Sequence, residues 1–127
     1  MNRKDLDNRL RELDLYSKFY YRKELKGLVQ LLGEGEVLNC LLTGVHEANR
    51  KMLAVTDQRL IILFSGALAA GNITVIKRSA VTDYQFEKKL LFSKVSLQTA
   101  TGDSFVFTNT QGSLKDLFEW AMAQPLP

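Results

Sequence analysis

The sequence is poor in the residues that form disulfides and metal sites, because its 127 positions include one cysteine, Cys40, one histidine, His46, and two prolines. A single cysteine cannot form an internal disulfide. One cysteine and one histidine cannot supply the three or four side chains that hold a zinc ion. We therefore expect no structural metal and no cofactor.

Long apolar runs are lacking as well. The longest run, Leu60 to Phe64, is far shorter than the roughly 20 residues that cross a bilayer. The segment from Met1 to Asp7 is charged and lacks the apolar stretch of a signal peptide. We therefore expect a cytoplasmic protein, with peripheral attachment to the inner face of the membrane as an alternative.

The remaining composition is that of one soluble domain, with 46% hydrophobic and 24% charged residues in a chain long enough to bury its own core. The net charge of +3 is unevenly placed. Residues 1–27 hold eight Lys and Arg against five Asp and Glu, whereas the rest of the chain holds nine of each. Attraction to an anionic partner must therefore come from the N-terminal segment or from local clusters.

Residues 1–27 have the periodicity of an amphipathic helix that no Gly or Pro interrupts before Gly27. Its main apolar stripe consists of Leu6, Leu10, Leu13, Tyr16 and Tyr20. A second face carries Lys4, Arg11, Lys18 and Arg22, bordered by Leu15 and Phe19. This face suits an anionic membrane or a partner, and equally a solvated surface with i,i+4 ion pairs.

After Gly35 the pattern changes to about seven short strands followed by a helix. Strands are predicted at 37–44, 52–56, 59–64, 73–76, 81–86, 90–97 and 105–107. The last helix, capped by Ser113, has an apolar face of Leu114, Leu117, Phe118, Ala121 and Met122. We expect this helix to cover an open end or edge of an antiparallel sheet.

Three segments carry a family resemblance: Leu32-Gly-Glu-Gly-Glu-Val-Leu, Leu53-Ala-Val-Thr-Asp-Gln-Arg-Leu-Ile-Ile-Leu and Val95-Ser-Leu-Gln-Thr-Ala-Thr-Gly-Asp-Ser-Phe-Val-Phe. Together they resemble a bacterial pleckstrin-homology (PH) domain of the YokE-like kind, related in fold to the GRAM domains. The resemblance implies a mainly β, α+β fold. A seven-stranded bent antiparallel sheet or open barrel would occupy residues 28–123, with an added helix at 1–27 and a tail at 124–127.

In lipid-binding PH domains the headgroup site lies at the loops that join strands 1 and 2, 3 and 4, and 6 and 7. By this resemblance the first loop, residues 45–51, offers Arg50 and Lys51, and the second offers the apolar Leu68. The first strand lacks the basic residue of phosphoinositide-binding members, which disfavours specific inositol-phosphate recognition. The alternative is that residues 66–71 are a small-residue loop folded back onto the body.

Groups for catalysis are scarce. His46 lies beside Glu47 in a predicted turn, where a solvated histidine is expected, and Cys40 lies in an apolar strand, where a buried and unreactive thiol is expected. We expect no enzymatic activity. Nucleic-acid binding is disfavoured because the aromatic and basic residues at 19–23 are predicted to lie on a helix, not on a sheet platform.

The sequence therefore predicts a non-enzymatic PH-like interaction module. The first hypothesis is binding to a protein or to a second copy of the chain, with Leu15 and Phe19 as the contact face. The alternative is peripheral binding to anionic membrane lipid through the strand 1–2 and 3–4 loops and the basic helix.

Overall fold

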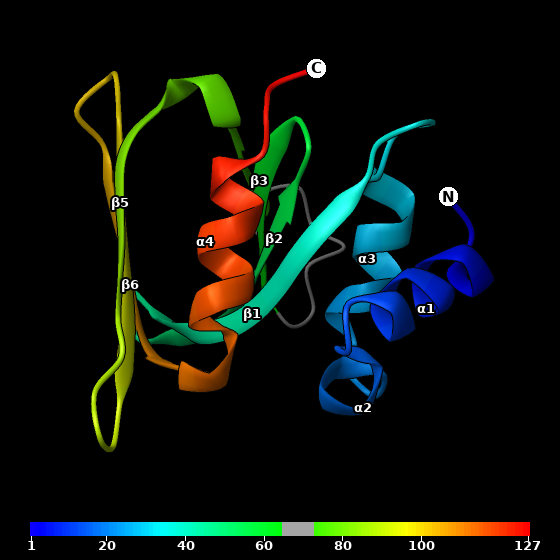
Figure 1. Ribbon diagram of the computed structural model, residues 1–127, viewed down its shortest axis with the longest axis horizontal. Coiled ribbons are helices and arrows are strands. Elements are labelled where there is room, and N and C mark those ends of the chain that lie inside the picture. Colours follow the sequence, from blue (N-terminus) through cyan, green and yellow to red (C-terminus); the bar gives the residue numbers. More distant parts are fainter. Residues whose placement is uncertain (65–72) are drawn as a thin grey trace.

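The chain forms a bent antiparallel sheet that curves around its last helix (Figure 1). The computed structural model describes residues 1–64 and 73–127. The strands are β1 (Leu38–His46), β2 (Asn49–Thr56), β3 (Arg59–Phe64), β4 (Ile73–Lys77), β5 (Val81–Glu87), β6 (Ser93–Thr99) and β7 (Ser104–Thr110). Their order in the sheet is β4-β3-β2-β1-β7-β6-β5, and each neighbouring pair is antiparallel. The predicted seven-stranded sheet with a C-terminal helix is confirmed.

The sheet bends where β1 meets β7. These strands share the single register pair of Val45 with Thr108, whereas β1 and β2 pair along their whole length. A Cβ atom on Gly44 would lie 2.7 Å from Cγ2 of Thr110 and 3.0 Å from the Thr108 carbonyl oxygen. Glycine is therefore required at this crossing, where any side chain would push the two strands apart.

Helix α4 (Lys115–Ala123) fills the inside of the bend (Figure 1). Its residues Phe118, Ala121 and Met122 are buried, and the Phe118 ring centroid lies 5.7 Å from that of Phe86. No side chain caps the helix N-terminus. The short 3-10 turn η3 (Gly112–Leu114) leads into α4 instead, so the predicted capping role of Ser113 is wrong.

The N-terminal segment contains three helices where the periodicity predicts one. They are α1 (Arg3–Glu12), α2 (Tyr16–Phe19) and α3 (Glu24–Leu31). The chain turns after α1 because Asp14 adopts a positive φ of 59°, a conformation that helices exclude. Gly27 does not end a helix, since α3 runs through it and a Cβ there would lie 3.8 Å from Leu63.

This turn buries the residues expected to form a self-association face. Leu15 and Phe19 are 0% and 2% exposed and belong to the core with Leu6, Leu10 and Leu25. The prediction that they remain exposed for a partner is wrong, because α2 folds back from α1 and brings both residues into the core. Self-association through these residues therefore loses its basis.

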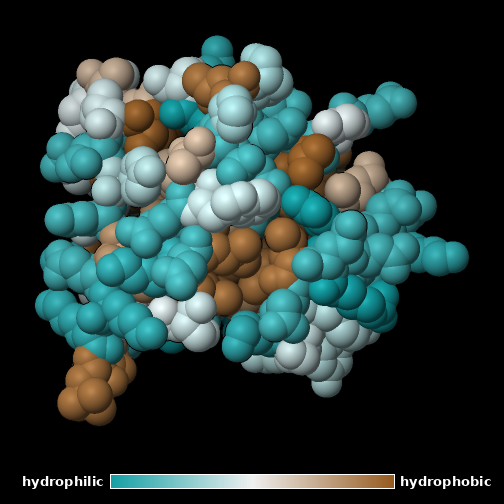
Figure 2. Space-filling model, viewed as in Figure 1, coloured by the Kyte–Doolittle hydropathy of each residue, from teal (hydrophilic) through white to brown (hydrophobic). Residues whose placement is uncertain are grey.

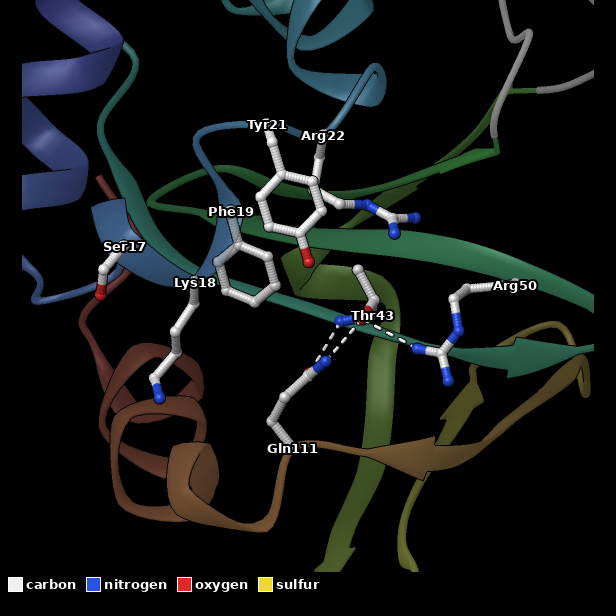
Figure 3. A pocket seen from close by; sticks show the side chains of 8 residues that line it. All are labelled: Ser17, Lys18, Phe19, Tyr21, Arg22, Thr43, Arg50 and Gln111. Carbon is white, nitrogen blue, oxygen red and sulfur yellow. Dashed lines mark hydrogen bonds between the residues drawn. The ribbon is translucent and has the colours of Figure 1, made fainter.

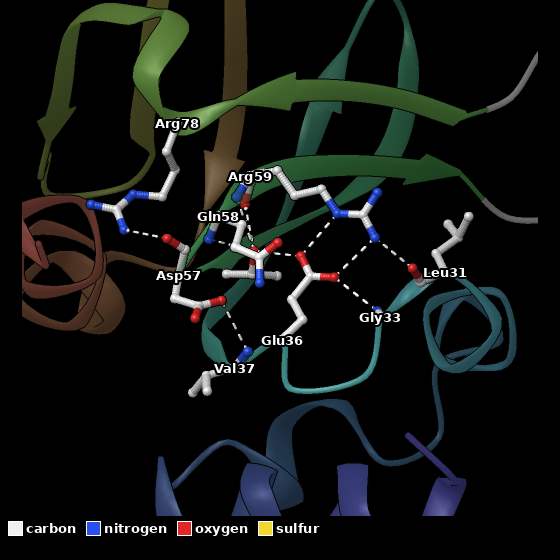
Figure 4. A network of polar contacts seen from close by, with 9 residues as sticks. Leu31, Gly33, Glu36, Val37, Asp57, Gln58, Arg59 and Arg78 are labelled. Carbon is white, nitrogen blue, oxygen red and sulfur yellow. Dashed lines mark hydrogen bonds and ion pairs between the residues drawn. The ribbon is translucent and has the colours of Figure 1, made fainter. Parts of the chain in front are cut away.

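A buried ion pair links the helical segment to the sheet (Figure 4). The Glu36 side chain is 2% exposed, and its Oε2 accepts hydrogen bonds from Nε of Arg59 at 2.8 Å and Oγ1 of Thr56 at 2.7 Å. Its Oε1 accepts from Nη2 of Arg59 and from the Gly33 amide, both at 2.9 Å. Because Arg59 also donates to the Leu31 carbonyl, the end of α3 is held against the β2–β3 turn.

Arg78 makes a corresponding link between the last helix and the sheet. Its guanidinium donates to the carbonyl oxygens of Asp57 at 3.0 Å, Met122 at 3.2 Å and Gln124. The last carbonyls of a helix have no partner within the helix and attract cations. Arg78 therefore fixes the end of α4 to the same β2–β3 turn that Glu36 holds from the other side.

Replacing Glu36 should test how much the fold depends on this pair. We expect Glu36→Gln to lower the free energy of unfolding by about 2 to 3 kcal/mol, because Arg59 would lose its carboxylate partner. Urea denaturation followed by circular dichroism measures the change. Glu34→Gln is the matched control, since Glu34 lies exposed in the same turn and should leave the midpoint unchanged.

The pair should also make the stability depend on pH. Burial alone raises the pKa of Glu36, but the hydrogen bonds from Arg59, Gly33 and Thr56 and the charge of Arg59 outweigh it, so the pKa lies below its ordinary value. Because the pKa of Glu36 is lower in the folded state than in the unfolded state, its carboxylate stabilises the fold fully at pH values above the unfolded-state pKa, near 4.3. This stabilisation is lost as the pH falls through the folded-state pKa. The stability difference between wild type and Glu36→Gln should therefore shrink from pH 6 towards pH 3. A constant difference would contradict this role of the carboxylate.

Candidate functional site: a basic pocket

Three of the basic residues predicted from sequence line one open pocket, although they come from distant segments (Figure 3). Lys18 lies on α2, Arg22 lies between α2 and α3, and Arg50 lies on β2. The pocket has a volume of about 480 Å³. Its other lining residues are Ser17, Phe19, Tyr21, Thr43 and Gln111, and none of the eight is acidic.

Arg50 lies on a strand and not in the predicted loop, which is a correction. The β1–β2 connection is the two-residue turn of Glu47 and Ala48, whose φ angles of 50° and 67° are both positive. In a hairpin with such a tight turn, both strands extend up to the turn itself. Because side chains alternate along a strand, Arg50 and its neighbour Lys51 point to opposite faces, and the partly buried Lys51 does not line the pocket.

Neutral acceptors hold the Arg50 guanidinium in place. Nη1 donates to Oγ1 of Thr43 at 3.0 Å, and Nη2 donates to the Asn109 carbonyl at 3.4 Å. Thr43 is itself fixed, because its amide donates to Oε1 of Gln111 at 3.0 Å and its Oγ1 accepts from Nε2 of Gln111 at 2.6 Å. The guanidinium is thus oriented by neutral acceptors, without a carboxylate among these contacts.

The other two cations differ from each other. Arg22 donates from Nε and Nη2 to the Glu24 carboxylate at 3.1 and 2.9 Å, and the Glu24 side chain is only 1% exposed. Arg22 therefore compensates a buried charge. Lys18 is exposed, and across residues 1–64 and 73–127 neither Lys18 nor Arg50 takes part in an ion pair. The pocket consequently has a net positive charge that comes from these two residues.

The remaining predicted basic residues lie elsewhere. Lys4 is exposed on α1, and Arg11 stacks its guanidinium 4.0 Å from the ring centroid of Tyr16. The predicted basic stripe is divided because α1 and α2 are separate helices. Leu68 lies outside the described residues.

The loops implied by the family resemblance contribute no cation in the part of the chain that the structure describes. The β1–β2 turn presents the acidic Glu47. The β6–β7 loop, residues 100–103, is closed by its own contacts, including a 3.0 Å hydrogen bond from Thr101 to the Asp103 carboxylate. The basic pocket is therefore a different site, formed where the N-terminal helices lie against strands β1 and β2.

Sequence reasoning missed Thr43 and Gln111. Thr43 gave a weak signal, since it is a hydroxyl residue within a mainly apolar strand. Gln111 gave none, because its contact with Thr43 spans 68 positions.

His46 is not the solvated loop residue that the sequence predicts. It ends β1, is 9% exposed, and lies between the rings of Phe105 and Phe107 at centroid distances of 5.7 and 5.1 Å. Its Nδ1 lies 3.1 Å from the Val106 carbonyl oxygen and its Nε2 lies 3.1 Å from the Glu47 carboxylate. Both ring nitrogens are thus engaged in the fold.

Comparisons with known proteins agree with this architecture. A family model described as bacterial PH domain matches residues 32–120. Twelve solved chains match, among them the C-terminal domain of an unknown protein from Leishmania infantum, with 21% identity, a TM-score of 0.56, and coverage of 83% of this chain and 93% of that one. No curated protein matches. The helices within the described residues are all too short or too polar to cross a membrane.

The environment of Cys40 predicts an unreactive thiol. It is fully buried in β1, and burial raises the pKa of the thiol to about 12. We expect a thiol reagent at pH 8 to modify the native protein more than about 100-fold more slowly than the urea-unfolded chain, because the thiolate is the reacting species. Mass spectrometry follows the adduct, and equal rates in the two states would contradict the burial of Cys40.

Proposed function

We propose, from the premise that this chain belongs to the bacterial PH domain family, that it is a non-enzymatic interaction module that binds a phosphate-bearing anion in the basic pocket. Domains of this fold generally bind partners and do not catalyse reactions. The observation that carries the proposal is that Lys18 and Arg50 border one open pocket and, among the described residues, neither has a carboxylate partner.

The chemistry of the lining favours phosphate. A guanidinium presents its N–H groups as a planar fork that matches two oxygens of a phosphate group, and an ammonium group adds a second charge. Arg50 is already oriented by Thr43 and Asn109, so less conformational entropy is lost when an anion binds. The exposed phenol of Tyr21 points into the same space and offers a neutral donor (Figure 3).

The two sequence hypotheses fare differently against this geometry. Protein binding or self-association rested on Leu15 and Phe19, which are buried, so no residue of that face supports it. The membrane alternative rested partly on Lys18, Arg22 and Arg50, which line the same pocket. The shared ligand chemistry is a phosphate group, whether on a lipid headgroup or on a soluble compound.

Titration of the ¹⁵N-labelled protein with inorganic phosphate and with glycerol 3-phosphate should test the pocket. We expect shifts of the amide signals of Lys18, Thr43 and Arg50, with a dissociation constant on the order of 1 mM. Arg50→Ala should weaken binding about tenfold, since one charge-assisted contact is lost. The affinity of Arg50→Lys should lie between those of the wild type and Arg50→Ala, because lysine keeps the positive charge without the planar set of guanidinium donors.

Lys77→Ala is the matched control, because Lys77 is equally a cation but lies exposed on the edge strand β4. It should leave the affinity unchanged. Equal weakening by Lys77→Ala and Arg50→Ala would show only a response to net charge, and absence of any shift near the pocket would refute the proposal. Binding of glycerol 3-phosphate in preference to inorganic phosphate would point to a headgroup as the source.

A further inference from the structure

The tip of the β5–β6 hairpin exposes three consecutive apolar side chains. Leu90, Leu91 and Phe92 are 100%, 81% and 60% exposed. Apolar atoms project from the lower left of the space-filling view (Figure 2), where the ribbon places this tip (Figure 1). Soluble proteins rarely expose such a run unless it has a binding role.

Packing does not explain these residues. The last register pair of β5 and β6 is Glu87 with Lys94, so the tip extends beyond the ladder that joins the two strands. The sequence prediction of a strand from residue 90 is wrong by three positions, because β6 begins at the buried Ser93. Apolar and polar residues alternate only after Phe92, so the unbroken apolar run before it could have been recognised as lying outside the strand.

The charge around the tip is positive. Lys88, Lys89 and Lys94 flank the apolar run, and Glu87 is the one acidic residue between positions 87 and 94. Glu87 lies 3.7 Å from the ammonium group of Lys89, and both side chains are exposed, so this ion pair is weak. The segment therefore combines apolar side chains with cations at its base.

A lipid bilayer suits this combination better than a protein does. The tip projects, so a protein partner would need a complementary cavity, whereas a bilayer admits projecting apolar side chains while lysines remain at the level of the phosphates. The tip, the η3 turn and α2, which carries Lys18, all lie along the lower edge in Figure 1. One flat anionic surface could therefore meet the tip and the α2 edge together.

We propose that Leu90, Leu91 and Phe92 insert into the interfacial region of an anionic bilayer while Lys88 and Lys89 contact lipid phosphates. This goes beyond the phosphate pocket, since the tip shares no residue with it. The two proposals can therefore fail separately.

Vesicle flotation tests the insertion. Wild type should float with vesicles of equal parts phosphatidylcholine and phosphatidylglycerol in 50 mM salt, and less in 300 mM salt because the lysine contribution is screened. The double variant Leu90→Ser/Leu91→Ser should lose binding by about tenfold or more. Lys88→Gln/Lys89→Gln should lose about fivefold per lysine and most of the salt dependence.

Val75→Ser is the control for the apolar change, since Val75 is also an exposed apolar residue, 48% exposed, but lies on β4. It should bind as wild type does. Depth is read from Phe92→Trp in a Trp120→Phe background, where the indole fluorescence should shift to shorter wavelength on vesicles and be quenched by brominated lipid. Circular dichroism should show that these surface variants remain folded.

The outcomes separate the possibilities. Failure of wild type to float at 50 mM salt, or equal floating of the leucine variant, would overturn the insertion. A dimer that the leucine variant converts to a monomer, without vesicle binding, would assign the tip to a second copy and overturn it too. Arg50→Ala should still float, and Leu90→Ser/Leu91→Ser should still bind inorganic phosphate, so the pocket and the tip are judged independently.

Discussion

The buried carboxylate of Glu36 determines how the two parts of this fold meet. Four hydrogen bonds from Arg59, Thr56 and Gly33 satisfy it, and Arg59 extends the contact to the last carbonyl of α3. A buried carboxylate without such donors would be costly, so the turn after α3 can occupy only the position where these donors converge. That position sets α2 beside β1 and β2. The basic pocket lies between them.

The same network explains why part of the fold could be predicted from sequence. Glu36 lies in the first of the segments that resemble a PH domain, and Thr56 and Arg59 lie in the second. In this chain the two segments meet at one joint, the ion pair of Glu36 and Arg59. Apolar runs and alternation add the strands: β1, β2 and β3 are buried over most of their length, whereas β6 alternates between buried and more exposed residues. The bacterial PH assignment is confirmed, and the narrower YokE-like and GRAM likeness stays a prediction.

Periodicity could not predict the helical segment in the same way. The spacing of apolar residues predicts one helix over residues 1–27, but Asp14 adopts a positive φ and the chain reverses. Tertiary packing then buries Leu15 and Phe19, which a single helix would leave at the border of its polar face. For the same reason the pocket was not visible in the sequence. Its cations are close to one another only after that reversal, across an interval of 32 residues between Lys18 and Arg50.

The net charge of +3 gives little guide to where an anion binds. Arg3 pairs with Asp7, Arg9 donates to the Leu38 carbonyl, and Arg22 pairs with the buried Glu24, so much of the positive charge of the first 27 residues is used within the fold. Two local groups of cations bear on anion binding: Lys18 with Arg50 at the pocket, and Lys88 with Lys89 at the hairpin tip. Two cations at each place attract an anionic surface weakly and over a short range in salt. Attachment to a bilayer then requires the apolar contribution of the tip, because neither pair of cations alone supplies enough attraction to hold the protein there.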